Sequence, residues 1–88
     1  MLTLQIKTDK PFGGYWDGGP KDTFDLTLGR VQEDKKGKFQ KIDCYDANYW
    51  FHVAKGKTDK ITLINGLNHI RHMFKRENIS FTYSFITE

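Results

Sequence analysis

Cys44 and His52 are the residues of this 88-residue chain whose types could form a nucleophile and its base. A cysteine attacks as its thiolate, and a histidine within hydrogen-bond reach can accept the thiol proton. The two lie eight residues apart, so a hairpin could make them neighbours. The strand pattern around Cys44 equally favours a small apolar side chain in the core. We therefore interpret Cys44 as a core residue and predict that the protein is not an enzyme.

His69 and His72 stand at positions i and i+3 of a predicted helix, a spacing that can hold a metal ion. A zinc site needs further ligands, and neither Asp59 nor Glu77 shares the helix face of these histidines. Both histidines are therefore interpreted as solvated side chains. The sequence predicts no metal site.

The tripeptide GKT at 56–58 resembles the end of a phosphate-binding loop. The full signature needs a glycine five positions before the Gly-Lys pair, and that position is Phe51. Lys57 beside a helix start could still attract a lone phosphate. A capped helix start next to solvated lysines explains the same residues, so no cofactor is predicted.

One face of the predicted helix carries polar and basic residues with almost no acid. Its members are Asn65, His69, His72, Lys75 and Arg76, opposite the apolar stripe. A solvated helix usually mixes Glu with Lys, whereas amide, imidazole and guanidinium groups bind phosphates, bases and acidic side chains well. We predict that these five residues contact a partner; plain exposure is the alternative.

The stretch KPFGGYWDGGPKD, from Lys10 to Asp22, holds four glycines, two prolines and the adjacent aromatics Tyr15 and Trp16. It exceeds the roughly two to five residues of a usual hairpin loop, and long loops in small domains often bind a ligand or partner. Tyr and Trp are also enriched at binding hot spots. We predict that Tyr15 and Trp16 contact a partner while Phe12 packs inward. The alternative is a loop that closes one end of the core.

Basic residues dominate the later part of the chain. Residues 1–34 contain four basic and six acidic side chains, and residues 35–88 contain ten and five, so their balances of −2 and +5 give the net charge of +3. A basic surface attracts nucleic acid or an acidic protein. The predicted nucleic-acid-binding residues are Lys35, Lys36, Lys38, Lys41, Lys55, Lys57, Lys60 and Arg71. A solvated, lysine-rich surface is the alternative interpretation.

Strands are predicted to position most of these residues. Apolar residues alternate in LTLQIKT and in TFDLTLGRV, and the alternation shifts at Gly29, as at a β-bulge. The segment EDKKGK predicts a turn with Gly37 at positive φ. Two further strands are predicted near 39–45 and 48–55. A short helix over 47–54 is the alternative.

A helix is predicted after the N-cap Thr58, with Asn78 as the C′ residue that follows its C-terminal end. Its apolar stripe consists of Leu63, Ile64, Leu67, Ile70 and Phe74. Gly66 weakens the helix by about 1 kcal/mol relative to alanine, which indicates that it marks close packing against the sheet.

The final segment ISFTYSFIT alternates and predicts a last strand. Its apolar face consists of Ile79, Phe81, Tyr83 and Phe85, opposite a face of Ser and Thr. We assign this aromatic face to the core beneath the helix, in preference to an exposed platform for stacking bases.

The element order β-β-β-β-α-β predicts an α+β fold. We expect an antiparallel-rich sheet of four to five strands, with one helix in the C-terminal half packed on one face. Residues 1–88 are predicted to form a single small domain.

Two hypotheses on function follow. The first is a small basic, non-enzymatic interaction protein that docks on a protein or ribonucleoprotein and blocks or modulates it; the alternative is direct binding of RNA or DNA. An exposed edge strand could also pair two copies into a homodimer. The single cysteine, the lack of a signal-peptide pattern and the lack of a long apolar run predict a cytoplasmic protein that does not enter a membrane.

Overall fold

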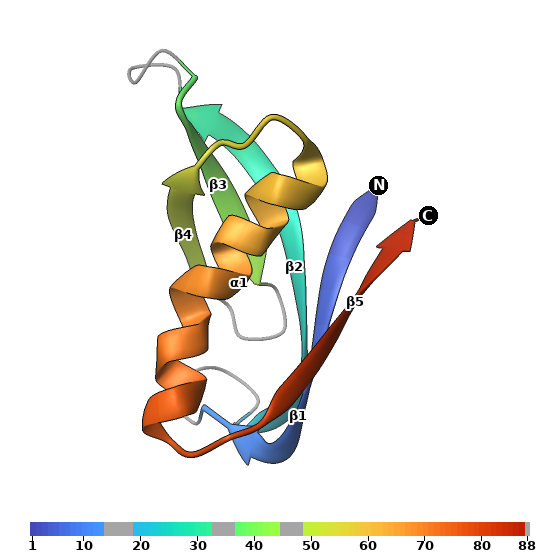
Figure 1. Cartoon of the computed structure of the whole chain (residues 1–88), viewed down its shortest axis with the longest axis vertical. Coiled ribbons are helices and arrows are strands. Elements are labelled where there is room, and N and C mark those ends of the chain that lie inside the picture. The colour runs from blue at the N-terminus through green and yellow to red at the C-terminus, as the bar shows by residue number, and fades with distance from the viewer. Residues whose placement is uncertain (14–18, 33–36, 45–48, 88) are drawn as a thin grey trace.

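The described part of the chain forms one antiparallel sheet and one helix. The computed structural model describes residues 1–13, 19–32, 37–44 and 49–87. The elements are β1 (Leu2–Phe12), β2 (Lys21–Gln32), β3 (Phe39–Cys44), β4 (Tyr49–Ala54), α1 (Asp59–Arg76) and β5 (Phe81–Thr87) (Figure 1). The predicted α+β fold, with one helix after the fourth strand, is confirmed.

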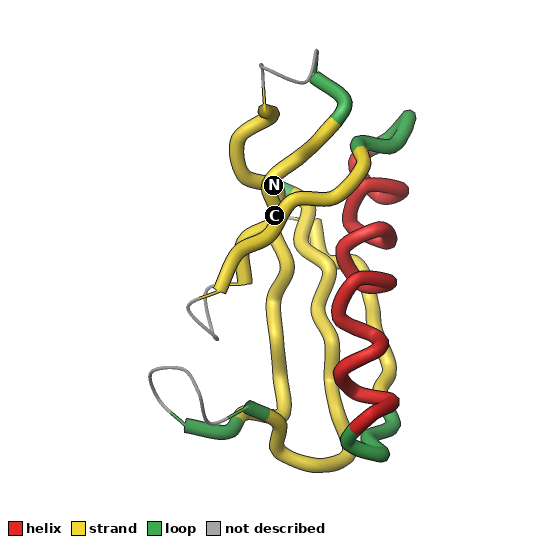
Figure 2. The backbone as a smooth tube through the Cα atoms, turned by 90° about the vertical axis from the view of Figure 1, so that its left-hand side faces the viewer, coloured by secondary structure: helices red, strands yellow, loops and turns green. Residues whose placement is uncertain are grey.

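The strands are ordered β4-β3-β2-β1-β5. Every neighbouring pair of strands is antiparallel. Because β4 and β5 are the first and last strands in this order, they form the two edges of the sheet, and α1 connects one edge to the other. Figure 2 shows α1 lying along one side of the sheet. The helix packs mainly against β1, β2, β3 and β4.

Alternation along the strands decides which side chains enter the core. Leu4, Ile6, Leu26 and Ile42 are fully buried on the helix side of the sheet. The stripe of α1 supplies Leu63, Leu67, Ile70 and Phe74 to the same core, as predicted, while Ile64 is only half-buried. Burial of these side chains stabilises the two layers by about 1.5–3 kcal/mol per large apolar residue.

The predicted irregularity at Gly29 is present. The pairing of β2 with β3 shifts register between Leu28 and Val31. The predicted positive φ of Gly37 is confirmed at 73°, whereas residues 33–36 of the predicted turn lie outside the described residues. Phe39–Cys44 and Tyr49–Ala54 are strands, as predicted, and not a short helix. Residues 45–48, within the predicted break between these strands, lie outside the described residues.

The helix begins and ends at the predicted residues. The Thr58 hydroxyl accepts the backbone N–H of Ile61 at 3.2 Å, so it caps the first turn. At the other end Asn78 has a φ of 60°, and the Ile79 N–H donates to the Phe74 carbonyl at 2.9 Å. The predicted close approach of Gly66 is also confirmed, because a Cβ at this position would lie 3.3 Å from the Ile42 side chain.

Candidate functional site

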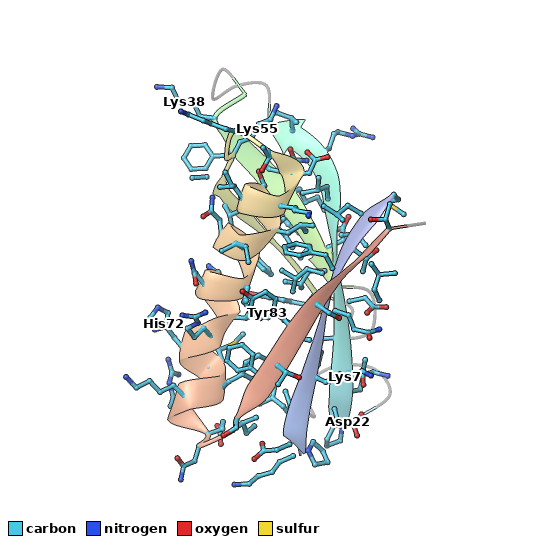
Figure 3. All side chains as sticks on the ribbon, turned by 45° about the vertical axis from the view of Figure 1, so that its right-hand side comes forward. Lys7, Asp22, Lys38, Lys55, His72 and Tyr83 are labelled. Atoms are coloured by element: carbon cyan, nitrogen blue, oxygen red, sulfur yellow. The ribbon has the colours of Figure 1, made fainter. Side chains whose placement is uncertain are left out.

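The predicted partner-binding face of α1 divides into two parts. The Asn65 amide donates to the Ala54 carbonyl at 2.7 Å, and the His69 ring stacks on the Phe51 ring at 4.3 Å with 12° between their planes. These contacts tie the helix to β4, which gives Asn65 and His69 a structural role. Of the five predicted residues, Asn65 is half-buried, and His69 remains exposed although it stacks on Phe51. His72, Lys75 and Arg76 are exposed in the last turns of α1; Figure 3 shows His72 pointing away from the helix.

The glycine-rich loop is described only at its two ends. The predicted contact residues Tyr15 and Trp16 lie outside the described residues. Phe12 packs inward as predicted, with its ring 5.1 Å from that of Phe74 and 6.3 Å from that of Phe24. The predicted bounds of the loop, Lys10 to Asp22, are too wide, because Lys10–Phe12 belong to β1, Lys21 and Asp22 belong to β2, and Phe12 pairs with Lys21. The end of β1 before the loop is therefore anchored in the core.

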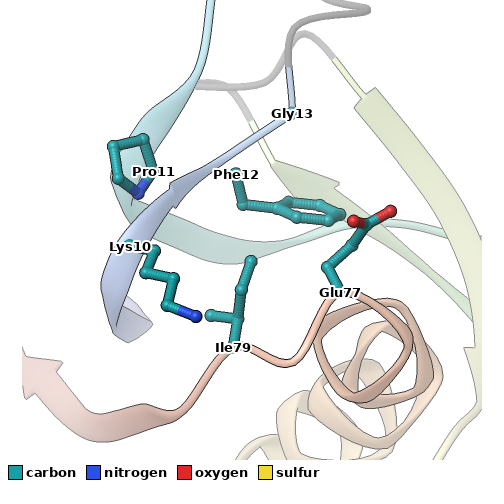
Figure 4. A pocket seen from close by; sticks show the side chains of 6 residues that line it. All are labelled: Lys10, Pro11, Phe12, Gly13, Glu77 and Ile79. Carbon is teal, nitrogen blue, oxygen red and sulfur yellow. The ribbon is translucent and has the colours of Figure 1, made fainter.

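A pocket of about 220 Å³ lies beside this anchor, between the end of β1 and the end of α1. Figure 4 shows the apolar side chains of Phe12 and Ile79 between those of Lys10 and Glu77. The Lys10 ammonium donates to the Asn78 carbonyl at 3.3 Å, so it helps to hold the chain between α1 and β5. A single cation opposite a single carboxylate does not form a catalytic set.

The predicted nucleic-acid-binding residues that the structure describes do not form one patch. Lys35 and Lys36 lie outside the described residues. The Lys55 N–H donates to the Lys38 carbonyl at 2.7 Å, so these two lysines lie together at one end of the molecule (Figure 3). Lys57, two residues after Lys55 and just before the start of α1, is also exposed. The remaining members of the set, Lys41, Lys60 and Arg71, lie elsewhere, each next to an aromatic ring.

The sheet face opposite α1, which we call the open face, carries an exposed tryptophan. Trp50 lies opposite Asp43 in the β3–β4 register, and its side chain is 55% exposed. The Lys41 ammonium lies 5.3 Å from the centre of the indole and 3.3 Å from an Asp43 carboxylate oxygen. The His52 ring meets the indole edge to face at 5.3 Å. We call Lys41, Asp43, Trp50 and His52 the Trp50 cluster.

The Trp50 cluster depends on Gly29 in the neighbouring strand. A Cβ at Gly29 would lie 2.8 Å from an Asp43 carboxylate oxygen and 3.1 Å from the Lys41 side chain. The ion pair therefore lies directly over this glycine. The absence of a side chain there lets the charged pair rest on the sheet beside the indole, which restricts the motion of Trp50 before any partner arrives.

The aromatic face of β5 is only partly covered. Tyr83 is 46% exposed, so its assignment to the core is wrong. Phe81 and Phe85 are half-buried. Cations from α1 lie over these two rings: Arg71 is 5.9 Å from the centre of Phe81, and Lys60 is 5.4 Å from that of Phe85. The reason is the position of α1, which packs mainly on β1 to β4 and leaves the outer strand exposed.

The two catalytic arrangements considered in the sequence are not assembled. Cys44 is buried against the helix, whereas His52 is exposed on the open face. Within the described ranges, no three His, Cys, Asp or Glu side chains lie close enough to share a metal ion.

Comparisons with known proteins supply no further assignment. The chain matches no protein-family model, no curated protein and no solved structure. No helix in the described part of the chain has the length and apolar character needed to cross a membrane.

Sequence reasoning overlooked Trp50, although the sequence contained a signal for it. In the segment YWFHV, Phe51 and Val53 share one face of a strand and Trp50 and His52 share the other. Because Phe51 and Val53 are apolar, they are the pair expected in the core. This parity alone would have placed Trp50 on the opposite face.

Proposed function

We propose that this protein is a small non-enzymatic interaction protein that docks on a protein or ribonucleoprotein and blocks or modulates it. Its contact surface is the open face, centred on Trp50. One observation carries the proposal: a tryptophan that is 55% exposed is nevertheless held by Lys41 and His52. Tryptophan is among the residues most enriched at binding hot spots.

Two properties of Trp50 favour binding: the large apolar area of its indole and the restriction of its side chain by its neighbours. An indole buries a large apolar area when a partner covers it. Because its neighbours already restrict Trp50, docking loses little side-chain entropy. Phe39, which is 38% exposed, lies on the open face further along β3, with the Lys41–His52 pair between it and Trp50. A partner with an apolar recess would cover the indole, and the sheet around Trp50 would then obstruct the surface of that partner.

The test separates binding from stability. Trp50→Ala should leave the melting temperature within a few degrees of the parent, because the indole lies outside the core. Binding to a partner captured from the host should weaken by about 2 kcal/mol or more, the range of a hot spot. Ile61→Ala is the matched control, because Ile61 is 45% exposed on α1, away from the open face. Equal capture by the parent and Trp50→Ala would refute the open-face contact.

Binding of RNA or DNA is the second candidate. It is favoured by the grouping of Lys38, Lys55 and Lys57 beside the start of α1. Exposed lysines on neighbouring turns can neutralise phosphates irrespective of base sequence. Nuclease treatment before capture distinguishes the two candidates, since a protein partner would survive it.

We further propose that the protein acts in the cytoplasm. The chain has one cysteine, Cys44, and it is buried in the core. Such a protein does not depend on an oxidising compartment for its stability.

A further inference from the structure

Along β5, the backbone N–H and C=O groups point alternately toward β1 and toward the outer edge of the sheet. The Asp9 N–H donates to the Ser80 carbonyl at 2.9 Å, so the backbone groups of Ser80 point toward β1. In an antiparallel ladder this direction alternates along the strand. The groups of Thr82, Ser84 and Ile86 therefore also point toward β1. Those of Phe81, Tyr83, Phe85 and Thr87 point to the outer edge.

The edge at β5 lacks the features that usually prevent strands from pairing. Residues 81–87 contain no charged residue, proline or glycine. Edge strands are normally protected by such residues, by shortness or by a covering element. At the opposite edge, α1 satisfies one carbonyl, because Asn65 donates to the Ala54 carbonyl at the end of β4. The helix packs mainly on β1 to β4, so it gives β5 little cover.

We propose that β5 pairs with β5 of a second copy, antiparallel, about a two-fold axis that passes through Ser84. The two sheets then form one continuous sheet with both helices on the same side. This pairing is separate from the docking through Trp50, because β4 and β5 are opposite edges of the sheet.

The register follows from overlap and hydrogen bonding. Full overlap of residues 81–87 places Phe81 opposite Thr87 of the second copy, which puts Ser84 at the centre. Tyr83 then lies opposite Phe85 of the second copy. These four residues are the ones whose backbone groups point outward, so outward donors meet outward acceptors throughout. Ser84 becomes a pair without hydrogen bonds, in which the side chains approach closely.

The side chains favour the same register. Tyr83 is 46% exposed in the single chain and would be covered by the aromatic ring of the second copy. Aromatic residues directly opposite each other stabilise antiparallel pairs. β5 itself contributes no charged side chain to the pairing. The cations near it, Lys60 and Arg71, come from α1 and lie over the rings of Phe85 and Phe81.

Cysteine cross-linking tests the axis directly. In Ser84→Cys the two introduced Cα atoms would lie about 4.5 Å apart, the separation of a pair without hydrogen bonds and within disulfide reach. Thr82→Cys is the matched control: it is exposed on the same face, but its two copies would lie about 13 Å apart along the strands. Cys44 is buried and does not compete.

After mild oxidation, Ser84→Cys should run as a covalent dimer on a non-reducing gel and Thr82→Cys should not. Light scattering of the unmodified protein should give twice its 10.3 kDa chain mass. Ser84→Lys should reduce that mass to one chain, because two ammonium groups would meet at the axis, while Thr82→Lys should not. A single-chain mass for the unmodified protein would overturn the proposal, as would cross-linking of Thr82→Cys in place of Ser84→Cys.

Discussion

The role of a side chain on α1 depends on whether it contacts the strand that lies opposite it. On the helix alone, Asn65 and His69 lie on the polar face opposite the apolar stripe. In the folded chain one donates to a β4 carbonyl and the other stacks on Phe51. His72, one turn further on, is exposed. Residues of the same types on one helix therefore have different roles.

This difference can be measured with two matched substitutions. His69→Ala should lower the free energy of unfolding by about 0.5–1.5 kcal/mol, because it removes a stacked ring from Phe51. His72→Ala should change it by less than about 0.5 kcal/mol, as is usual for an exposed residue. Urea denaturation of the two variants supplies both values. Equal losses from the two variants would contradict the assigned roles.

At the level of elements, α1 covers one face of the sheet and forms the hydrophobic core with it. Leu63, Leu67 and Phe74 are almost completely buried against strands from both halves of the chain. The helix ends are satisfied locally by the Thr58 cap and by the reversal at Asn78. Its orientation on the sheet is therefore decided by the packing of its stripe.

A charge in that stripe should unfold the protein. Leu67→Asp would place an unpaired carboxylate at a position that is 0% exposed, which costs several kcal/mol out of a total stability of about 5–15 kcal/mol. Asn68→Asp, at the adjacent exposed position, should change the melting temperature little. Circular dichroism melts compare them. A Leu67→Asp variant that melts within two or so degrees of the parent would refute the assigned stripe.

Across the whole molecule, the two proposed contact surfaces lie at opposite edges of the sheet. The Trp50 cluster belongs to β3 and β4, whereas the proposed pairing uses β5. Pairing at one edge therefore leaves the other accessible. The lysines beside the start of α1 form a third surface, and its charge makes it the part of the molecule most sensitive to salt.

Salt dependence tests that third surface. If the protein binds a single-stranded oligonucleotide, the logarithm of the affinity should fall linearly with the logarithm of the salt concentration. Changing Lys38, Lys55 and Lys57 to Gln should flatten the slope by about 2, since each phosphate contact on a single strand contributes about 0.7. Changing three lysines elsewhere, Lys7, Lys10 and Lys21, controls for the loss of charge. Fluorescence anisotropy titrations give the slopes, and equal slopes for the two triple variants would exclude this lysine group as the binding site.

The amino-acid sequence by itself determined the elements and their order. Alternation in the strands, the cap at Thr58, the reversal at Asn78 and the shift at Gly29 are local patterns, and each has the predicted form. These patterns can be recognised in the sequence because each depends on only a few neighbouring residues. The inward packing of Phe12 and the close packing of Gly66 against the sheet were also predicted, because they follow from residue size and element order.

Only the tertiary structure decided which surfaces remain exposed. The edge to which each strand belongs, and the strands that α1 covers, depend on contacts between residues far apart in the chain. The helix packs on β1 to β4, so Asn65 and His69 are drawn into contact with β4 and Tyr83 is left half exposed on β5. Strand parity indicates which face a side chain occupies, but the placement of the helix decides how much of that face is covered.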